Sequence, residues 1–450
     1  MKSEEIHLSA PENSPEYRAA AGIVSALRGA GFEAYLVGGA VRDLVLGKTP
    51  EDYDVTTSAH PEQVTALFEH SIPVGAAFGV VTVVANSMNF EVATFREERD
   101  YEDGRRPGTL RYSRTPEEDV ARRDFTVNAL LFDPEKSLVI DFVGGLADLR
   151  RSVLRTIGDA RTRFSEDYLR MLRAVRFAVR FRFELEKETA AAIRELSHKL
   201  VFLSAERVRD ELTRMLCGPD PDRAFRKLSE LGILSVVLPE VEAMHGVEQP
   251  EKFHPEGDVF EHTMQMLSHI AWPTPELGWA VLLHDAGKPP CRTVDSDGNL
   301  HFYGHENRGA AMAREILLRL KAPSALVKSV EQAVANHMRF AHVDKMRPAK
   351  WRRLIADPNF PVELELHRID CMGSHRLLTN YLLLLDRIRE LEAAGQEAVP
   401  LPLLTGRDLI ALGIPPGPGM GKLLRHLNDL QLEGVVRTRE EAIRALNEAR

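Results

Sequence analysis

The chain has 450 residues, of which 44% are hydrophobic and 28% charged, a composition typical of a globular protein of two to four domains. Its formal net charge of −9 argues mildly against nucleic acid as a partner, although residues 150–183 hold ten arginines and only three acidic residues. The polar, acidic N-terminus excludes a secretory signal, and no apolar run approaches the ~18 residues that a membrane span needs. The three cysteines, Cys217, Cys291 and Cys371, have no metal-ligand spacing and indicate no disulfide framework, so we expect a cytoplasmic protein without membrane contact.

Signals for helix and strand alternate in the first third of the chain. In chain order they predict a helix over 16–30, a strand over 34–39, a helix over 40–46, a strand over 51–58, a helix over 61–69 and a β-hairpin over 79–95 that turns at Asn86-Ser87. The charged, aperiodic stretch 96–119 predicts a mobile loop. From about residue 151 helical patterns dominate, and 393–403 has the composition of a linker. We therefore expect a small α/β head followed by a long helical body.

Two acidic residues in the predicted strand 51–58 indicate a cation site. Residues two apart in a strand point to the same face, so Asp52 and Asp54 are expected to project together, with Tyr53 turned away. Carboxylates this close repel each other unless cations lie between them, and Mg²⁺ prefers oxygen ligands. Two such ions, roughly 3.5–4 Å apart, hold the attacking and leaving oxygens in many phosphoryl transfers. Glu91, on another predicted strand, is a candidate third carboxylate.

A glycine pair lies between the predicted strand 34–39 and the helix that follows it. Backbone N–H groups at such a turn are able to face a phosphate, which makes Gly38 and Gly39 candidate nucleotide-binding residues. Arg42, one turn into the helix, could reach the same anion. A tight turn without any ligand is the alternative.

The order of the motifs resembles the class II tRNA nucleotidyltransferase and bacterial poly(A) polymerase family, within the DNA polymerase β superfamily. The matching stretches are GGAVRDLVLGKTPEDYD (38–54), ARRDFTVNAL (121–130), DFVGGLADL (141–149), EDYLRMLRAVRF (166–177) and SAERVRDEL (204–212). The resemblance implies an α+β protein: a polymerase-β-like nucleotidyltransferase head, with a mixed sheet and helices, precedes an elongated all-helical neck, an HD body and a tail. The expected parts are an N-terminal extension (1–20), the catalytic head (21–150), the neck (151–220), the HD body (221–392) and an RNA-binding tail (393–450).

Helical spacing in 166–177 predicts that Asp167 and Arg170 are neighbours on one helix face. Ionised aspartate only accepts hydrogen bonds and arginine only donates, so the pair matches the Watson–Crick edges of cytosine and adenine and mismatches those of uracil and guanine. In the family such a pair serves as a protein template, a role that the resemblance gives to these two residues. It also implies that Arg173 and Arg176 hold triphosphate or base and that Glu166 orients Arg170 or caps the helix. A salt-bridged helix without a ligand is the alternative.

The second motif and two further segments supply other candidate contacts. By resemblance, Arg123 meets nucleotide phosphates, Asp124 holds that arginine in position, and Asn128 bonds sugar or backbone. The remaining candidate contacts to RNA are Arg105 and Arg106 in the stretch 96–119, Arg207 in the neck, and Lys422 and Arg425 in the tail. The last two follow Pro416-Gly417-Pro418-Gly419, which leads into a predicted helix and could equally be a plain helix cap. The stretch 97–115, with Arg105-Arg106-Pro107, resembles the full-length flexible loop of family members that can add A, which favours an enzyme able to incorporate AMP.

A second set of metal-ligating residues lies in the body. His262, His284, Asp285 and Asp370 resemble the metal site of HD domains, and His305 and His337 resemble the additional histidines that bind further metal or phosphate. Imidazole and carboxylate ligands suit a transition metal or Mg²⁺, and the identity of the ion stays open. Related domains hydrolyse 2′,3′-cyclic phosphates and phosphomonoesters, whereas others are inactive.

The motifs together predict an enzyme that adds CMP or AMP, from CTP or ATP, to the 3′ end of tRNA. Two Mg²⁺ ions in the head would support the transfer, with release of pyrophosphate. A bacterial poly(A) polymerase is the alternative in the same class, and addition of A alone to tRNA ending in CC also stays open. The alternatives of other classes are an HD metal phosphohydrolase with a non-catalytic RNA-binding head and a non-catalytic RNA-binding scaffold. The oligomeric state is left open.

Overall fold

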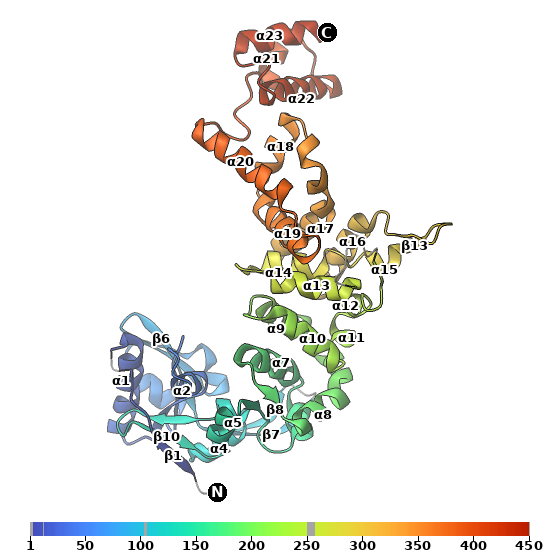
Figure 1. The fold of residues 1–450 in the computed structure, drawn as a ribbon. Helices are drawn as coiled ribbons and strands as arrows, with labels where there is room; N and C mark the ends of the chain where they lie inside the picture. The colour runs from blue at the N-terminus through green and yellow to red at the C-terminus, as the bar shows by residue number, and fades with distance from the viewer. Residues whose placement is uncertain (1–2, 12, 103–105, 250–256, 450) are drawn as a thin grey trace. The chain divides into compact units, whose positions relative to one another are not determined.

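The computed structural model describes residues 3–11, 13–102, 106–249 and 257–449, with the side chains of Val74, Ala77 and 97–110 left out. The chain divides into two compact units, Met1–Pro239 (unit 1) and Glu240–Arg450 (unit 2) (Figure 1). No described helix combines the length and the apolarity that crossing a membrane requires.

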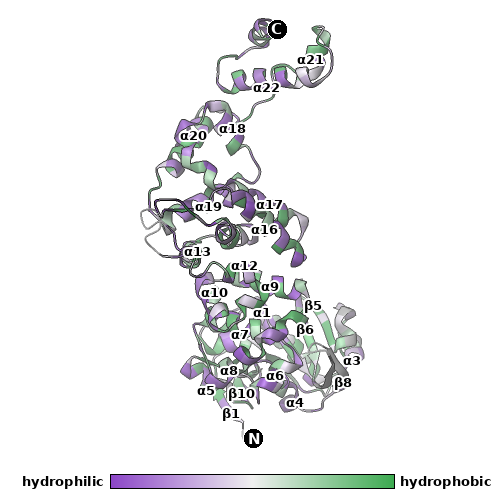
Figure 2. Ribbon diagram, turned by 90° about the vertical axis from the view of Figure 1, so that its right-hand side faces the viewer, coloured by the Kyte–Doolittle hydropathy of each residue, from purple (hydrophilic) through white to green (hydrophobic). Residues whose placement is uncertain are grey.

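A mixed eight-stranded sheet forms the first half of unit 1. Its strands are β1 (Glu4–His7), β2 (Ala34–Val37), β3 (Asp54–Thr57), β4 (Ser71–Ile72), β5 (Val80–Ala85), β6 (Met88–Thr94), β9 (Leu131–Asp133) and β10 (Leu138–Asp141). They lie in the order β1-β10-β9-β2-β3-β6-β5-β4, and only the β3–β6 pair is parallel. The predicted hairpin is confirmed as β5–β6, with Asn86 and Ser87 at positive φ in the turn. Its apolar side chains colour both strands green in Figure 2.

Helices surround this sheet and then continue without it. The helices of unit 1 are α1 (Pro15–Gly29), α2 (Gly39–Val45), α3 (Pro61–Leu67), η1 (Pro73–Phe78), α4 (Pro116–Ala121), η2 (Thr126–Asn128), α5 (Gly145–Arg151), α6 (Ala160–Glu166), α7 (Leu169–Phe181), α8 (Lys187–Leu196), η3 (Ser197–Phe202), α9 (Ala205–Leu216), α10 (Pro221–Glu230) and α11 (Leu234–Val237). A short parallel pair, β11 (Val153–Leu154) and β12 (Glu184–Leu185), interrupts them. The expected α+β class, with a mixed sheet followed by helices, is confirmed.

One predicted element of unit 1 is shorter than expected and another is wrong. The strand expected over 51–58 begins only at Asp54, because Val37 pairs with Asp54 as the last residue of β2 and Gly38 then turns away. Asp52 therefore precedes the strand. The stretch 96–119 is not a loop: β7 (Arg96–Glu102) and β8 (Arg106–Tyr112) pair antiparallel and lead into α4. Strands this polar lack the alternating apolar pattern from which a strand is predicted.

Unit 2 is helical. Its helices are α13 (Val259–Ser268), α14 (Pro275–Leu283), α15 (Lys288–Cys291), α16 (His305–Arg319), α17 (Ser324–Asn336), η4 (His337–Lys345), α18 (Pro348–Ile355), α19 (Phe360–Gly373), α20 (Thr379–Ala393), α21 (Gly406–Ala411), α22 (Pro418–Leu432) and α23 (Arg439–Glu448); α12 (Pro239–Glu242) spans the border of the two units. A hairpin of β13 (Thr293–Val294) and β14 (Leu300–His301) follows α15. The last three helices share a core that contains Leu409, Leu427 and Leu446. The five-part division of the chain stays a prediction.

Candidate functional site

The glycine turn and the first acidic residue of β3 lie next to each other in unit 1. Gly38 follows β2 with φ +78, a backbone conformation that favours glycine. A Cβ added there would lie 3.8 Å from Asp54 Oδ2 and 3.5 Å from Arg123 Nη1. The turn, a carboxylate and a guanidinium therefore border the same space, as the sequence predicted for an anion held beside a cation.

Three carboxylates gather at the end of β3. The parallel register that pairs Val55 with Val92 places Asp54 beside Glu91, and Asp52 is exposed immediately before the strand. Burial, together with the charges of Asp52 and Glu91, raises the pKa of Asp54 to about 6, while Arg123 acts in the opposite direction. A divalent cation between neighbouring carboxylates relieves their mutual repulsion, so this donor set fits Mg²⁺. Tyr53 is buried and points away against Tyr17, as predicted.

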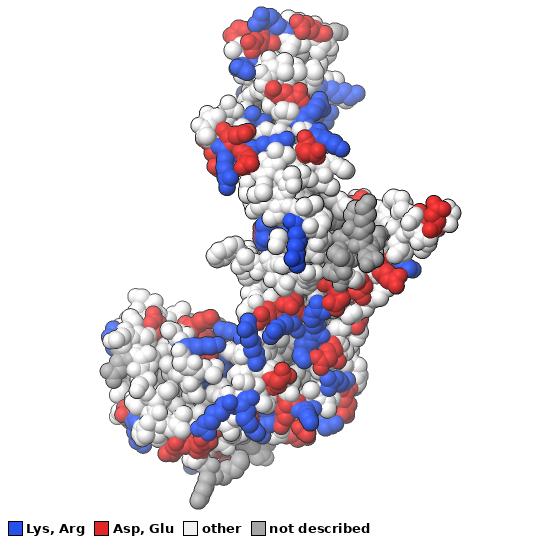
Figure 3. Space-filling view, in the orientation of Figure 1, with Lys and Arg blue, Asp and Glu red and all other residues white. Residues whose placement is uncertain are grey.

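A cavity of about 550 Å³ opens beside these carboxylates, and we call it the nucleotide cavity. Its lining includes most of the predicted nucleotide-binding residues, namely Gly38, Gly39, Arg42, Asp52, Asp54, Arg123, Asp124, Asn128, Asp167, Arg170 and Arg173. Arginines dominate the cationic part of the wall, which suits a triphosphate. Figure 3 shows basic side chains across the visible face of unit 1 around α7 and α9, with acidic ones between them. Glu91 and Arg176 do not line this cavity.

Arg123 is held by a residue that the sequence did not single out. Its Nη2 lies 3.2 Å from Asp119 Oδ2, whereas Asp124 bonds elsewhere, so the predicted Asp124–Arg123 pair is wrong. Asp119 is fully buried and also accepts hydrogen bonds from Arg122 and Thr56. Burial alone would raise the pKa of Asp119, but the charges of Arg123 and Arg122 outweigh it and lower that pKa. The spacings i,i+3 and i,i+4 after Asp119 were the available signal for these pairs.

A buried chain of hydrogen bonds links the glycine helix α2 to α7. Arg42 donates to Asn128 Oδ1 at 2.6 Å and to Asp43 Oδ1 at 2.9 Å. Asn128 Nδ2 donates to Asp124 at 3.3 Å, and Asp124 Oδ2 accepts from Nε and Nη2 of Arg173 at 2.9 and 2.7 Å. Asn128 was expected to bond sugar or backbone, and here it connects the Arg42 guanidinium to the Asp124 carboxylate. We call Arg42, Asn128, Asp124 and Arg173 the relay.

The predicted single helix over 166–177 is broken at Asp167. This residue has φ −148 and ψ 105 between α6 and α7, and its Oδ1 accepts a hydrogen bond from the Leu169 backbone N–H. Asp167 and Arg170 therefore do not face each other along a helix, and Asp167 Oδ2 pairs with Arg207 at 2.7 Å. Glu166 lies 2.6 Å from Arg170, so the contact expected between these two residues is present. Both members of the expected template still line the nucleotide cavity.

The remaining candidate residues do not line this cavity, or they lie outside the residues that the structure describes. Arg176 donates to Glu211 of α9 at 2.6 Å, and Glu211 is 2% exposed. Arg105 lies outside the described residues, and Arg106 is the first residue of β8. Lys422 and Arg425 are exposed on α22, which begins at Pro418 as the sequence predicted.

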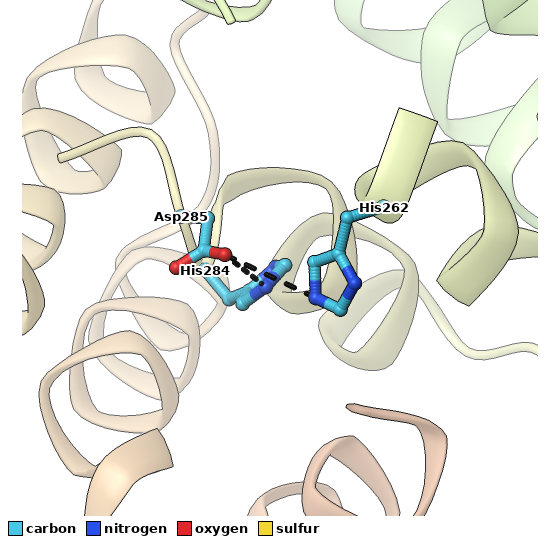
Figure 4. Close-up of side chains that lie close together, drawn as sticks. All are labelled: His262, His284 and Asp285. Carbon is cyan, nitrogen blue, oxygen red and sulfur yellow. Dashed lines mark ion pairs between the residues drawn. The ribbon is translucent and has the colours of Figure 1, made fainter. Parts of the chain in front are cut away.

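The predicted HD ligands meet in unit 2. His262 comes from α13, His284 and Asp285 follow α14, and Asp370 lies on α19. Asp285 Oδ2 lies 3.0 Å from His284 Nε2 and 4.0 Å from His262 Nε2 (Figure 4). His262 Nε2 also lies 3.3 Å from Asp370 Oδ1. These atoms converge from separate helices, as a metal site requires.

The two additional histidines use the other oxygen of the same aspartate. Asp285 Oδ1 lies 3.5 Å from His305 Nε2 and 3.9 Å from His337 Nε2. Potential ligand atoms thus form two groups, His262–His284–Asp285 and Asp285–His305–His337, each within 4.8 Å. One carboxylate belongs to both groups, and a bridging carboxylate is a common feature of dinuclear metal sites.

Backbone carbonyl groups fix the orientation of three of these imidazoles. The Nδ1 atoms of His284, His305 and His337 donate to the carbonyl oxygens of Val281, Phe302 and Val334 at 2.7–2.8 Å. A carbonyl only accepts, so Nδ1 carries the proton and Nε2 keeps the lone pair that a metal needs. All three Nε2 atoms face Asp285.

Electrostatics in this cluster favour an ionised Asp285 and a neutral His337. Burial raises the pKa of Asp285, but His284 and Lys288 overcome this effect and hold it well below its ordinary value. Burial, and the proximity of other histidines, lower the pKa of His337 to about 4. This is the ionisation state of a metal-binding set. Lys288 Nζ, 2.7 Å from Asp285, was missed in the sequence, although it belongs to the stretch HDAGKP.

The cluster borders a cavity of about 930 Å³ in unit 2. Besides the ligands, its wall contains Lys288 and the apolar side chains of Leu300, Phe302, Tyr303, Met338 and Leu377. Tyr303 and Leu377 are among the most exposed apolar side chains described. The cavity therefore combines a floor of candidate metal ligands with a wall that fits a planar, apolar group.

Three family models match the chain in order. They are the "Poly A polymerase head domain" over residues 34–155, the "Probable RNA and SrmB- binding site of polymerase A" over 182–244 and the "HD domain" over 259–370. The chain is 36% identical to the A-adding tRNA nucleotidyltransferase of Deinococcus radiodurans, across 91% of this chain and 94% of that protein. It is 31% identical to the CCA-adding enzyme of Lactobacillus johnsonii, across 96% and 97% of the two chains.

Solved structures agree with these sequence matches. The CCA-adding enzyme of Bacillus stearothermophilus in complex with CTP superposes with a TM-score of 0.74 and 30% identity, over 97% of this chain and 98% of that one. The Thermotoga maritima CCA-adding enzyme complexed with tRNA has a TM-score of 0.62 at 18% identity, over 99% of both chains, which shows a shared fold.

Proposed function

The chain belongs to the tRNA nucleotidyltransferase family that includes the CCA-adding enzymes, and from this membership we propose that it adds AMP, and CMP before it, to the 3′ end of tRNA. One observation carries the proposal. Asp54, Gly38 and Arg123 border one space beside the nucleotide cavity, so a carboxylate for a divalent cation and donors for phosphate are adjacent. CTP and ATP are the proposed donors, and tRNA is the proposed acceptor.

The residues of the nucleotide cavity would position the reactants. Arg123 and the backbone N–H groups at Gly38 and Gly39 would hold the triphosphate so that pyrophosphate leaves in line with the attacking 3′-oxygen. Asp52 and Asp54 would bind two Mg²⁺ ions, which neutralise charge at the reacting phosphate and lower the pKa of the hydroxyl. Glu91, beside Asp54, would add negative charge to this binding set.

Asp167 and Arg170 would select the base. Asp167 accepts hydrogen bonds and Arg170 donates them, so together they fit the edges of cytosine and adenine. Each is held by a separate partner, Arg207 for Asp167 and Glu166 for Arg170, so the two charges are oriented before a nucleotide arrives. Pre-orientation of this kind lowers the entropic cost of recognition.

The decisive experiment offers tRNA transcripts that end before CCA, after C and after CC, each with a single nucleoside triphosphate. Full CCA synthesis requires CMP addition to the first two transcripts and AMP addition to the third. AMP addition to the third transcript alone identifies an A-adding enzyme, and long A tails on unrelated RNA identify a poly(A) polymerase. A protein that adds no nucleotide to any of the three refutes the proposal.

The head is tested separately by Asp52→Ala. This change removes one proposed metal ligand and is expected to reduce nucleotide addition by at least a factor of about 10³, on the scale of a lost charge-stabilising group. Asp210→Ala is the matched control, because Asp210 is an exposed aspartate of α9 paired with Arg209. Unchanged addition by Asp52→Ala would remove Asp52 from the site.

We also propose a second activity, metal-dependent hydrolysis of phosphate esters in unit 2. The supporting observation is the pair of ligand groups that share Asp285 below an apolar wall. Such a floor would bind the phosphate of a nucleotide end, and the wall would contact its base. The presence of metal ions in this site and the number of ions per chain are also part of this proposal.

Hydrolysis of 2′,3′-cyclic AMP and of p-nitrophenyl phosphate, measured with Mg²⁺, Mn²⁺, Co²⁺ or Ni²⁺, tests the second activity. Asp285→Asn is expected to abolish hydrolysis and leave nucleotide addition unchanged. Asp297→Asn, an exposed aspartate of the β13–β14 hairpin, is the control. Wild-type protein that hydrolyses neither compound with any of the four ions would refute this activity.

A further inference from the structure

A second cavity of unit 1, of about 670 Å³, lies next to the nucleotide cavity. Its wall is formed by α7, by the end of α9 and by the segment that leads into α10, and includes Arg176, Arg214, Cys217 and Asp220. The two cavities share Glu51, Asp52 and Arg180. Asp52 therefore lies at the border between them.

The chemistry of this second wall fits a nucleotide of RNA. Arg180 and Arg214 have side chains that are 39% and 62% exposed, paired with Glu51 and Glu211 at 3.3 and 3.2 Å. The Arg180–Glu51 pair is exposed on both sides, so its guanidinium can exchange the carboxylate for a phosphodiester, and the Arg214 side chain reaches solvent although Glu211 is buried. Val179, Met215 and Pro219 give the same cavity apolar atoms for a sugar and a base. Its volume lies within the range of small-molecule sites.

The geometry of phosphoryl transfer indicates which reactant the second cavity binds. The attacking and leaving oxygens lie on opposite sides of the phosphorus. Gly38 and Arg123, which would hold the leaving pyrophosphate, border the nucleotide cavity and not the second one. Asp52 adjoins both, so the attacking hydroxyl is best placed on the side of the second cavity.

We propose that the second cavity receives the 3′-terminal nucleotide of the acceptor RNA and presents its 3′-hydroxyl at Asp52. The assignment rests on the proposed nucleotidyltransferase function and adds to it a separate acceptor subsite. Arg214 and Arg180 bind the last phosphodiester, and Cys217 lies against the nucleoside. The subsite takes a single-stranded RNA end, because the cavity has room for an unpaired nucleotide.

Steady-state kinetics with tRNA ending in CC and ATP tests the subsite. Arg214→Ala is expected to raise the KM for tRNA about tenfold, the effect of one lost charged contact, and to leave the KM for ATP within a factor of about two. Cys217→Trp, which fills the cavity, is likewise expected to raise the KM for tRNA and not the KM for ATP. Arg194→Ala is the matched control, since Arg194 is 49% exposed, pairs with Glu230 and lines neither cavity.

Alkylation of the wild-type protein gives a readout that needs no variant. Peptide mass spectrometry after N-ethylmaleimide treatment is expected to show that tRNA slows the labelling of Cys217 at least fivefold, and that ATP alone does not. Cys291, in unit 2, is the internal control. The acceptor subsite is overturned by a tRNA KM unchanged in Arg214→Ala, or by labelling of Cys217 that tRNA does not slow. Absence of nucleotide addition by the wild type is a different result, which overturns the function itself.

Discussion

Asp124 accepts two hydrogen bonds from the guanidinium of Arg173, at 2.9 and 2.7 Å, although 49 residues separate them in the chain. The bond joins the second motif of the head to α7, the helix that carries Arg170. Burial would raise the pKa of Asp124, but the charge of Arg173 outweighs it, and this pKa is lowered. The carboxylate is therefore ionised at neutral pH and fixes one end of the relay.

Asp124→Asn is expected to lower the free energy of unfolding by about 2 kcal/mol, because a half-buried guanidinium loses its charged partner. It is also expected to raise the KM for both ATP and CTP, since Arg173 and Asn128 lose a shared acceptor. Urea denaturation and initial rates measure the two effects. Glu195→Gln, at an exposed pair with Arg161, is the control and stays within about 0.5 kcal/mol of the wild type. An equally small effect at Asp124 would contradict the relay.

Asp119 predicts a pH dependence of stability. Its pKa is lower in the folded protein than the ordinary value of 3.8, so its contribution is complete above that value and is lost as the pH falls through the folded pKa. The difference in unfolding free energy between the wild type and Asp119→Asn is therefore expected to be constant from pH 7 to about 5 and to shrink below 4. Denaturant titrations across this range measure it. A difference that grows as the pH falls would reverse the assignment.

Gly38→Ala separates backbone strain from disturbance of the site. The positive φ costs a residue with a Cβ roughly 1–2 kcal/mol, and here the Cβ also approaches Asp54 and Arg123. Gly47 has φ +70 with nothing within 4 Å of an added Cβ, so Gly47→Ala is a matched control. We expect similar losses of stability in thermal unfolding, but a loss of nucleotide addition only in Gly38→Ala. Equal activity of the two variants would show that the space beside Gly38 is not used.

The shared carboxylate of unit 2 predicts a metal stoichiometry. After loading with Mn²⁺ or Co²⁺ and gel filtration, elemental analysis is expected to find about two ions per chain in unit 2, one for each ligand group, counted as the excess over Asp285→Asn, which keeps only the ions held by the head. His305→Ala combined with His337→Ala is expected to leave about one. Nucleotide addition serves as the control for folding of unit 1. Two ions in the double variant would exclude the second ligand group.

Elements with a periodic apolar pattern were predictable from the sequence, and polar ones were not. The hairpin β5–β6 alternates buried and exposed residues, so its pattern predicts it. The hairpin β7–β8 carries no such pattern, because its pairing is made by backbone groups that every residue has. Asp167 fits a helix by spacing alone, and only the structure shows that it ends one.

Site residues were predictable as a set, but not their partners. The motifs around Asp54, Arg123 and His284 identified residues that line the nucleotide cavity of unit 1 and the cavity of unit 2. The Asp119–Arg123 pair has i,i+4 spacing and its signal was overlooked, whereas Glu211 holds Arg176 across 35 residues, a pairing that depends on how distant segments pack. The hydrogen bonds from the histidine Nδ1 atoms to backbone carbonyl groups were not predictable either, because they arise from local geometry at the ends of helices.

The relay has a consequence for modularity. The matched head domain ends at residue 155, yet Asp124 within it has its charged partner on α7, beyond that limit. A fragment that ends at residue 155 would keep the carboxylate of Asp124, which is shielded from water, without its cationic partner Arg173. If heads were exchanged between relatives at this junction, Asp124 would move without the Arg173 of its own chain. A segment that is recombined as one piece must therefore extend at least through Arg173.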